Sequence, residues 1–119
     1  MAEEGRKTYL EFIETSVFTD RLTKLTSKET LYALQSDLLE EPTRWPVIQG
    51  THGARKGRVA DPEVRRGKSG SFRYLYLFLP HVDRIYLIYL FSKDEQDNLT
   101  STQKKGIAWM CDLIREEVK

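Results

Sequence analysis

The chain has 119 residues, of which 39% are hydrophobic and 31% are charged, and its net charge is +1. This balance is typical of one globular domain, so we expect residues 1–119 to form a single domain in which only residues 1–8 are flexible. No apolar run approaches the roughly 20 residues of a membrane span, and the start lacks a secretory signal, which favours a cytoplasmic protein without membrane contact. The single cysteine, Cys111, excludes an internal disulfide and a cysteine-based zinc site, and we expect neither a metal nor a cofactor.

The first half of the chain predicts one strand followed by two helices. Polar and apolar residues alternate over 9–13, which indicates a strand. Thr15 or Ser16 then begins a helix whose apolar residues recur at spacings of three and four. Thr26 and Glu29 have the spacing of a capping box for a second helix, which Pro42 ends. Because the two helices are consecutive, we expect them to form a hairpin.

The second half predicts three strands and a last helix. We expect the strands over 54–60, 71–79 and 84–91. The last two are rich in large apolar residues at both parities, so both faces of the sheet should be covered. Thr100 and Gln103 form a second capping box, before an amphipathic helix that buries Cys111. The predicted fold class is therefore α+β, a small antiparallel sheet with an N-terminal helical hairpin and a C-terminal helix packed on it.

Positive charge is concentrated between residues 54 and 73, where seven basic residues stand against two acidic ones. The seven are Arg55, Lys56, Arg58, Arg65, Arg66, Lys68 and Arg73. Such a cluster attracts a polyanion, for example a phosphate backbone. Charge clusters are often only a solvated face, but strand alternation places Lys56 and Arg58 on the same side. That shared side favours a binding site.

Two apparent motifs do not require a chemical role. Gly67-Lys68-Ser69 resembles the end of a phosphate-binding loop, but Pro62 stands where that motif needs a glycine. His52 and His81 have the chemistry of an acid and base pair. His81, however, falls in a predicted turn, and isolated histidines are more often surface or turn residues. We therefore prefer the structural interpretation of both.

Aromatic residues beside the cations point to the kind of polyanion. The rings of the expected strand 71–79 should lie mostly in the core. On the next strand, Tyr89 shares its parity with Phe91 and, if the strand continues, with Lys93. A ring beside positive charge stacks an unpaired base, so this arrangement favours single-stranded RNA over a duplex.

Several segments together resemble the HigB toxins of the RelE superfamily. They are VIQGTHGARKGRVA at 47–60, GKSGSFR at 67–73 and YLFSKDE at 89–95, with shorter matches at 12–15 and 97–100. The order and spacing of these segments carry the resemblance, which runs from about residue 10 to the end of the chain. The family tends to have glycine at His52 and Ser71, a larger aliphatic residue at Ala54 and Gly57, and asparagine at Asp94.

The resemblance implies a toxin of a bacterial type II toxin–antitoxin system. Such a toxin enters the ribosomal A site and cuts messenger RNA without a metal, by attack of the ribose 2′-hydroxyl that leaves a cyclic phosphate. The implied partners are the ribosome, the messenger and a helix-turn-helix antitoxin similar to HigA, through which the complex of the two proteins binds operator DNA.

The same resemblance assigns roles to individual residues. It places Arg73 on the scissile phosphate, with Lys56, Arg58 and Lys93 around it as the catalytic group. Crowded cations favour a neutral amine, so Lys56 or Lys93 is the candidate base. The residues expected to contact RNA outside this group are Arg55, Arg65, Arg66, Lys68 and Tyr89.

Two alternatives stay open because a fold does not determine a function. The first is a toxin similar to ParE, which binds and inhibits a topoisomerase and cuts no RNA. The second is a noncatalytic RNA-binding domain, whose affinity for RNA would fall steeply as salt rises.

Overall fold

The computed structural model describes residues 9–62, 71–96 and 98–119. The segment expected to be flexible, residues 1–8, lies outside the described residues. The elements in chain order are β1 (Glu11–Glu14), α1 (Ser16–Leu25), α2 (Lys28–Glu40), β2 (Arg55–Ala60), β3 (Ser71–Leu79), the 3-10 turn η1 (Pro80–Val82), β4 (Arg84–Ser92) and α3 (Ser101–Glu117). Strands and helices therefore follow one another in the predicted order.

The described strands form one sheet in the order β1-β4-β3-β2. As expected, β2, β3 and β4 are antiparallel. The edge strand β1 differs, because it runs parallel to β4, with Phe12 opposite Ile85. Parallel neighbours need a long connection, and here the chain passes through both helices and two other strands before it returns as β4. The sheet is therefore mixed rather than purely antiparallel.

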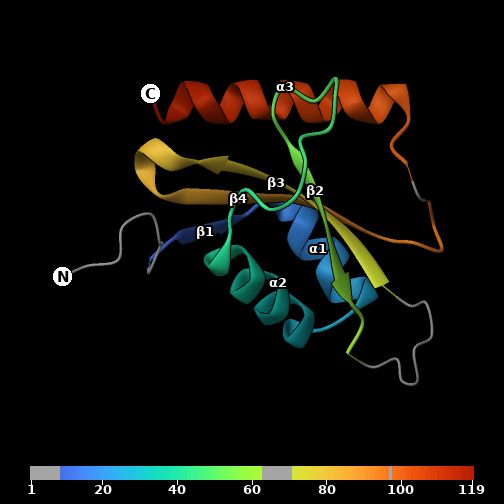
Figure 1. Ribbon diagram of the computed structural model, residues 1–119. Coiled ribbons are helices and arrows are strands. Elements are labelled where there is room, and N and C mark those ends of the chain that lie inside the picture. The colour runs from blue at the N-terminus through green and yellow to red at the C-terminus, as the bar shows by residue number, and fades with distance from the viewer. Residues whose placement is uncertain (1–8, 63–70, 97) are drawn as a thin grey trace.

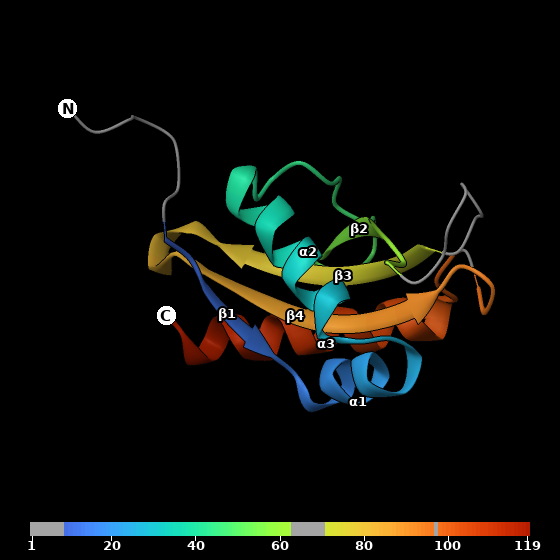
Figure 2. The ribbon, with the colours of Figure 1, turned by 90° about the horizontal axis from the view of Figure 1, so that it is seen from below.

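Helices cover both faces of this sheet (Figures 1 and 2). One core lies between the sheet and the helices α1 and α2, and contains Phe18, Leu34, Tyr74 and Tyr76, all fully buried. The other lies between the sheet and α3. It contains fully buried Cys111, and burial raises the pKa of this thiol to about 11. The prediction that both faces are covered is confirmed.

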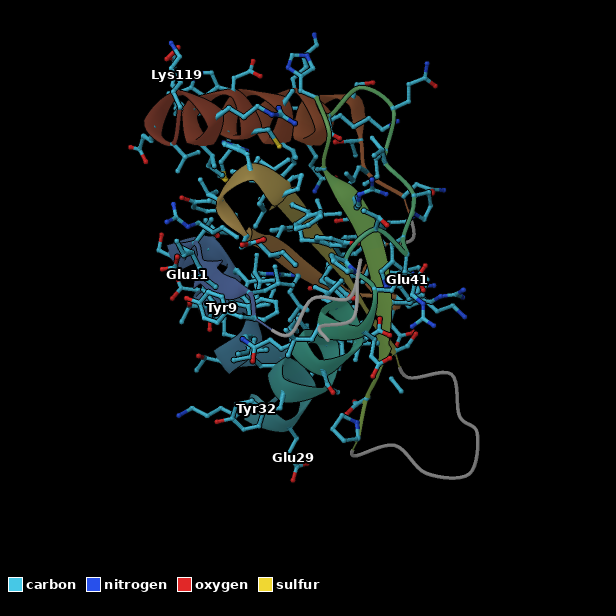
Figure 3. The ribbon with its side chains drawn as sticks, turned by 60° about the vertical axis from the view of Figure 1, so that its left-hand side comes forward. Tyr9, Glu11, Glu29, Tyr32, Glu41 and Lys119 are labelled. Carbon is cyan, nitrogen blue, oxygen red and sulfur yellow. The ribbon has the colours of Figure 1, made fainter. Side chains whose placement is uncertain are left out.

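Both polar and apolar side chains are exposed on the outer surfaces of these layers. Figure 3 shows Glu29 and Tyr32 projecting from α2 away from the sheet, while Tyr9 and Glu11 lie at the β1 edge. No helix among the described residues is long and apolar enough to cross a bilayer.

Hydrogen bonds at the helix ends confirm one capping box and contradict the other. The Thr100 hydroxyl accepts from the Gln103 N–H at 3.1 Å, and the Gln103 side chain accepts from the Thr100 N–H at 2.9 Å. The box expected at Thr26 is wrong. Only Thr26 and Ser27 separate the two helices. Thr26 is the C-cap of α1, with its N–H bonded to the Leu22 carbonyl, and Ser27 is the N-cap of α2.

Two of the departures from the HigB pattern have a visible cause. His52 has a φ of 61°, a left-handed conformation that favours glycine. The histidine ring instead contacts α3, with Nδ1 at 3.1 Å from both carboxylate oxygens of Asp112. Arg115 also donates to the His52 carbonyl at 2.6 Å. These bonds hold the connection between α2 and β2 against α3, as Figure 1 illustrates.

Gly57 is the other departure, and the Tyr74 ring explains it. Gly57 stands opposite Tyr74 in the β2–β3 register. A Cβ atom at position 57 would lie 2.3 Å from Cζ of Tyr74, so the tyrosine ring occupies the space that a larger aliphatic residue would need. Strand β2 is continuous through this glycine.

Candidate nucleic-acid interface

A cleft of about 310 Å³ opens beside β2 and β3. Its described lining residues are Trp45, Pro46, Lys56, Gly57, Arg58, Arg73 and Asn98. They come from three separate segments, namely the connection before β2, the β2–β3 pair and the connection between β4 and α3. The volume lies at the lower end of the roughly 300–1,000 Å³ that is usual for ligand sites.

The sheet register brings three of the expected cations to this cleft. Arg58 stands directly opposite Arg73, and Lys56 stands opposite Leu75. Directly opposed residues of antiparallel strands project to the same face, about 5 Å apart at their Cα atoms. Alternation along β2 adds Lys56 to that face. The expectation that Lys56 and Arg58 share one side is therefore met, and Arg73 joins them.

The three cations differ in how firmly they are held. Arg73 is only 8% exposed, and its guanidinium donates to the Ser71 hydroxyl at 3.0 Å. Lys56 is half-buried and Arg58 is exposed. A positive charge at low exposure acts on an anion through a lower effective dielectric than a charge in open water does. Arg73 is thus suited to fix an anion, and Arg58 to attract one.

Lys93 lies near this group but is not among the described residues that line the cleft. It is exposed, in the turn that follows β4. Its N–H donates to the Ser71 carbonyl at 3.2 Å, which places its backbone beside the residue that holds the Arg73 guanidinium. Lys93 therefore lies at the beginning of β3, near Arg73, but does not line the cleft.

Arg55 and Tyr89, expected to contact RNA, are directed elsewhere. Arg55 donates to the carbonyl oxygens of Trp45 at 2.6 Å and Thr43 at 3.3 Å, so it anchors the chain before β2. The Arg21 guanidinium lies over the Tyr89 ring, 5.3 Å from the ring centre. Tyr89 also lines a separate apolar groove with Trp109. Tyr89 is two strands from Lys56, a separation of about 10 Å.

The remaining expected contacts, Arg65, Arg66 and Lys68, lie outside the described residues. His52 contacts Asp112 in α3, and His81 contacts the carbonyl of Val118, the residue that follows α3. Neither is among the described residues of the cleft. Within ranges 9–62, 71–96 and 98–119, no group of three His, Cys, Asp or Glu side chains is placed to hold a metal ion.

Sequence reasoning missed the residues of the cleft that carry no charge. Trp45 and Pro46 form an apolar wall, and Asn98 adds an amide. The available signal was the position of Trp45, a large ring in the connection just before the basic strand. Asn98 offered no such signal, because asparagine is common in turns.

No family model matches the chain. Its structure is similar to that of the E. coli toxin RelE, solved as a double arginine-to-alanine mutant in the free state, with a TM-score of 0.52. The fold is RelE-like. The match covers 74% of this chain and 87% of the RelE chain, at 15% sequence identity. At that identity the likeness concerns the fold alone, and it confirms the predicted α+β fold class.

Proposed function

We propose that this protein is the toxin of a type II toxin–antitoxin system and that it cuts messenger RNA in the ribosomal A site. The observation that carries the proposal is the convergence of Lys56, Arg58 and Arg73 on one cleft of a RelE-like fold. The resemblance to HigB in residues 47–60, 67–73 and 89–95 supports this subfamily.

The chemistry of metal-independent RNA cleavage sets three requirements. The ribose 2′-hydroxyl must lose a proton, the negative charge of the phosphorane must be offset, and the departing 5′-oxygen must gain a proton. Arg73 offers a planar fork of donors for the phosphorane, and its low exposure holds that fork in place. Arg58, opposite Arg73, adds a second guanidinium. Lys56 is the lysine among the described residues that line the cleft and is the proposed base, with Lys93 as the other amine at this end of β3.

The ribosome has a physical role in this proposal. A cleft of about 310 Å³ holds little more than one nucleotide, so it cannot align a whole messenger by itself. Alignment of the reacting groups contributes much of the rate in such reactions, and the ribosome supplies it by holding the codon. The proposed place of action is therefore the cytoplasm. A helix-turn-helix antitoxin similar to HigA is the proposed inhibitor, and the complex is proposed to bind operator DNA through the antitoxin.

The test is messenger cleavage in a translating extract, with 5′ ends mapped and 3′ ends assayed for cyclic phosphate. We expect Arg58→Gln to lower the cleavage rate about 100-fold, the usual effect of removing one donor to a charged transition state. Arg73→Lys keeps the charge but removes the planar fork, so it should also impair cleavage. Lys28→Gln is the matched control, because Lys28 is exposed at the start of α2 and its loss changes the net charge equally.

Three outcomes would overturn the proposal. Intact messenger together with arrested supercoiling would favour the topoisomerase inhibitor. Salt-sensitive retardation of RNA without cyclic phosphate ends would favour the noncatalytic RNA-binding domain. Equal loss of cleavage in Arg58→Gln and Lys28→Gln would show that net charge, and not the cleft, is responsible.

A further inference from the structure

The cleft has two chemically different sides. Lys56, Arg58 and Arg73 form its cationic side, and Trp45 and Pro46, which come from the connection beside the edge of β2, form its apolar side. A phosphate needs only the first side. A nucleotide has both an anionic phosphate and an apolar aromatic base, so its two halves match the two sides of this cleft. The pairing of an indole with three cations in one small site is the observation that we develop.

Trp45 is held in position by its neighbours. Its indole N–H donates to Oδ2 of Asp37 on α2 at 3.2 Å, and its carbonyl accepts from Arg55 on β2 at 2.6 Å. The Arg44 guanidinium lies over the ring, 5.9 Å from its centre, and also pairs with Asp37. A ring fixed in this way loses little conformational entropy when a base stacks on it.

The distance between the two sides of the cleft is set by backbone hydrogen bonds. The N–H of Lys56 donates to the Pro46 carbonyl at 3.2 Å, and the N–H of Ile48 donates to the Ala54 carbonyl at 2.8 Å. Residues 46–48 therefore run along the outer edge of β2, which is the edge strand of the sheet. Lys56 thus belongs to both halves of the site, because its backbone holds the apolar side and its side chain lines the cationic side.

Trp45 has a simpler interpretation, in which it only closes the edge of the core. It is half-buried and packs against the core that contains Tyr74. This interpretation accounts for the indole but not for Asn98, which is exposed and comes to the same cleft from a different segment. A side-chain amide presents a donor and an acceptor together, the pattern that reads the edge of a base.

We propose that Trp45 and Pro46 form the stacking surface for one base of the bound messenger, and that Asn98 contacts the edge of that base. The inference rests on the proposed function, since it identifies the ligand as RNA. Trp45 would act on every base alike, because each has an aromatic face. Asn98 would act on some bases more than others, and would therefore contribute to the choice of cleavage site.

Nucleotide binding tests this inference without messenger cleavage. The chain has two tryptophans, so Trp109→Phe leaves Trp45 as the only indole fluorophore. Trp109 is exposed on α3 and is not among the described residues of the cleft. The probes are the four nucleoside 5′-monophosphates, with ribose 5-phosphate as the matched ligand that lacks a base. We expect the nucleotides to change Trp45 fluorescence and to bind roughly 5- to 100-fold more tightly than ribose 5-phosphate.

Variants then separate the two residues, with affinity measured by calorimetry. Trp45→Leu should reduce the affinity of all four nucleotides to that of ribose 5-phosphate, whereas Trp45→Phe, which keeps a ring, should retain most of the difference. Asn98→Ala should make the four affinities more equal and should broaden the set of sites cut in the translating extract. If Trp45→Leu does not fold, the fluorescence titration of Trp109→Phe still decides the question.

The outcomes distinguish this inference from the proposed function. Equal affinity for nucleotides and ribose 5-phosphate, or unchanged Trp45 fluorescence, would overturn the stacking surface even if the protein cuts messenger in the extract. Tight, base-dependent binding without any cleavage would support the stacking surface and overturn the nuclease. An unchanged spread of the four nucleotide affinities in Asn98→Ala would remove Asn98 from the inference.

Discussion

Alanine at Gly57 is expected to destabilise the protein, whereas alanine at Gly106 is expected to stabilise it. At position 57 a Cβ atom would lie 2.3 Å from Cζ, 2.6 Å from the hydroxyl oxygen and 2.8 Å from Cε1 of Tyr74. Ordinary contacts between carbon atoms are about 3.5–4.0 Å, so the ring would have to move by more than an ångström. Tyr74 is fully buried, with Tyr76 beside it at 5.7 Å between ring centres, and has little room to move.

The expected magnitudes follow from these surroundings. Inserting atoms into a filled core costs about 1–3 kcal/mol, and Gly57→Ala should fall in that range. At Gly106, in α3, a Cβ atom would meet nothing within 4 Å. Alanine is favoured over glycine in a helix by about 0.5–1 kcal/mol, so Gly106→Ala should be more stable than the parent by that amount.

Urea unfolding followed by circular dichroism measures both effects. With a slope of about 2 kcal/mol per molar urea, a loss of 2 kcal/mol lowers the midpoint by about 1 M. The ring is the expected cause, so Gly57→Ala should be much less harmful in a Tyr74→Leu background. The coupling between the two substitutions should be about 0.5–3 kcal/mol. A Gly57→Ala protein as stable as the parent, or a coupling of zero, would refute this account of the glycine.

Three further predictions concern burial and capping. Burial raises the pKa of the Cys111 thiol to about 11, so a thiol reagent at pH 8 should react far more slowly with the folded protein than with the urea-unfolded one, and equal rates would contradict the burial. Burial likewise raises the pKa of Tyr76 from 10.0 to about 12, and it raises that of Tyr74 further. The resulting stabilisation is complete below pH 10 and is lost as the pH rises toward 12. The urea midpoint should therefore be lower at pH 11 than at pH 9 and should fall less in Tyr76→Phe, whereas a constant midpoint would contradict this account. Thr100→Ala removes the acceptor for the Gln103 N–H and should cost about 1 kcal/mol by thermal melting, with Thr100→Ser close to the parent; the same loss in both would point away from the capping box.

Local patterns predicted those features that depend on local geometry. Alternation placed Lys56 and Arg58 on one side because the side-chain period of a strand is two. The Thr100 capping box was predictable because both of its partners lie within one helical turn. The prediction of a capping box at Thr26 was wrong because Thr26 is the C-cap of the preceding helix α1. Residue spacing alone does not show to which of two adjacent helices a cap residue belongs.

The features that depend on distant segments were not predictable in this way. The alternation of side chains along a strand tells which face of the sheet Tyr89 shares with Lys56. It does not tell that β3 lies between their two strands and separates the residues laterally. The sequence shows Arg55 only as one of the seven clustered cations. It does not show that the Arg55 guanidinium donates to the carbonyls of Thr43 and Trp45. Trp45 itself reaches the cleft because residues 46–48 pair with β2, a contact that periodicity does not encode.

The pairing of residues 46–48 with β2 also bears on how this protein behaves in solution. An unprotected outer strand offers its amides and carbonyls to other chains and so promotes aggregation. Here the Pro46 carbonyl and the Ile48 N–H already engage the beginning of that strand, and proline has no N–H of its own to extend the ladder outward. At the opposite margin, β1 has only four residues. Both margins of the sheet therefore offer only a short stretch of backbone for pairing with a second copy.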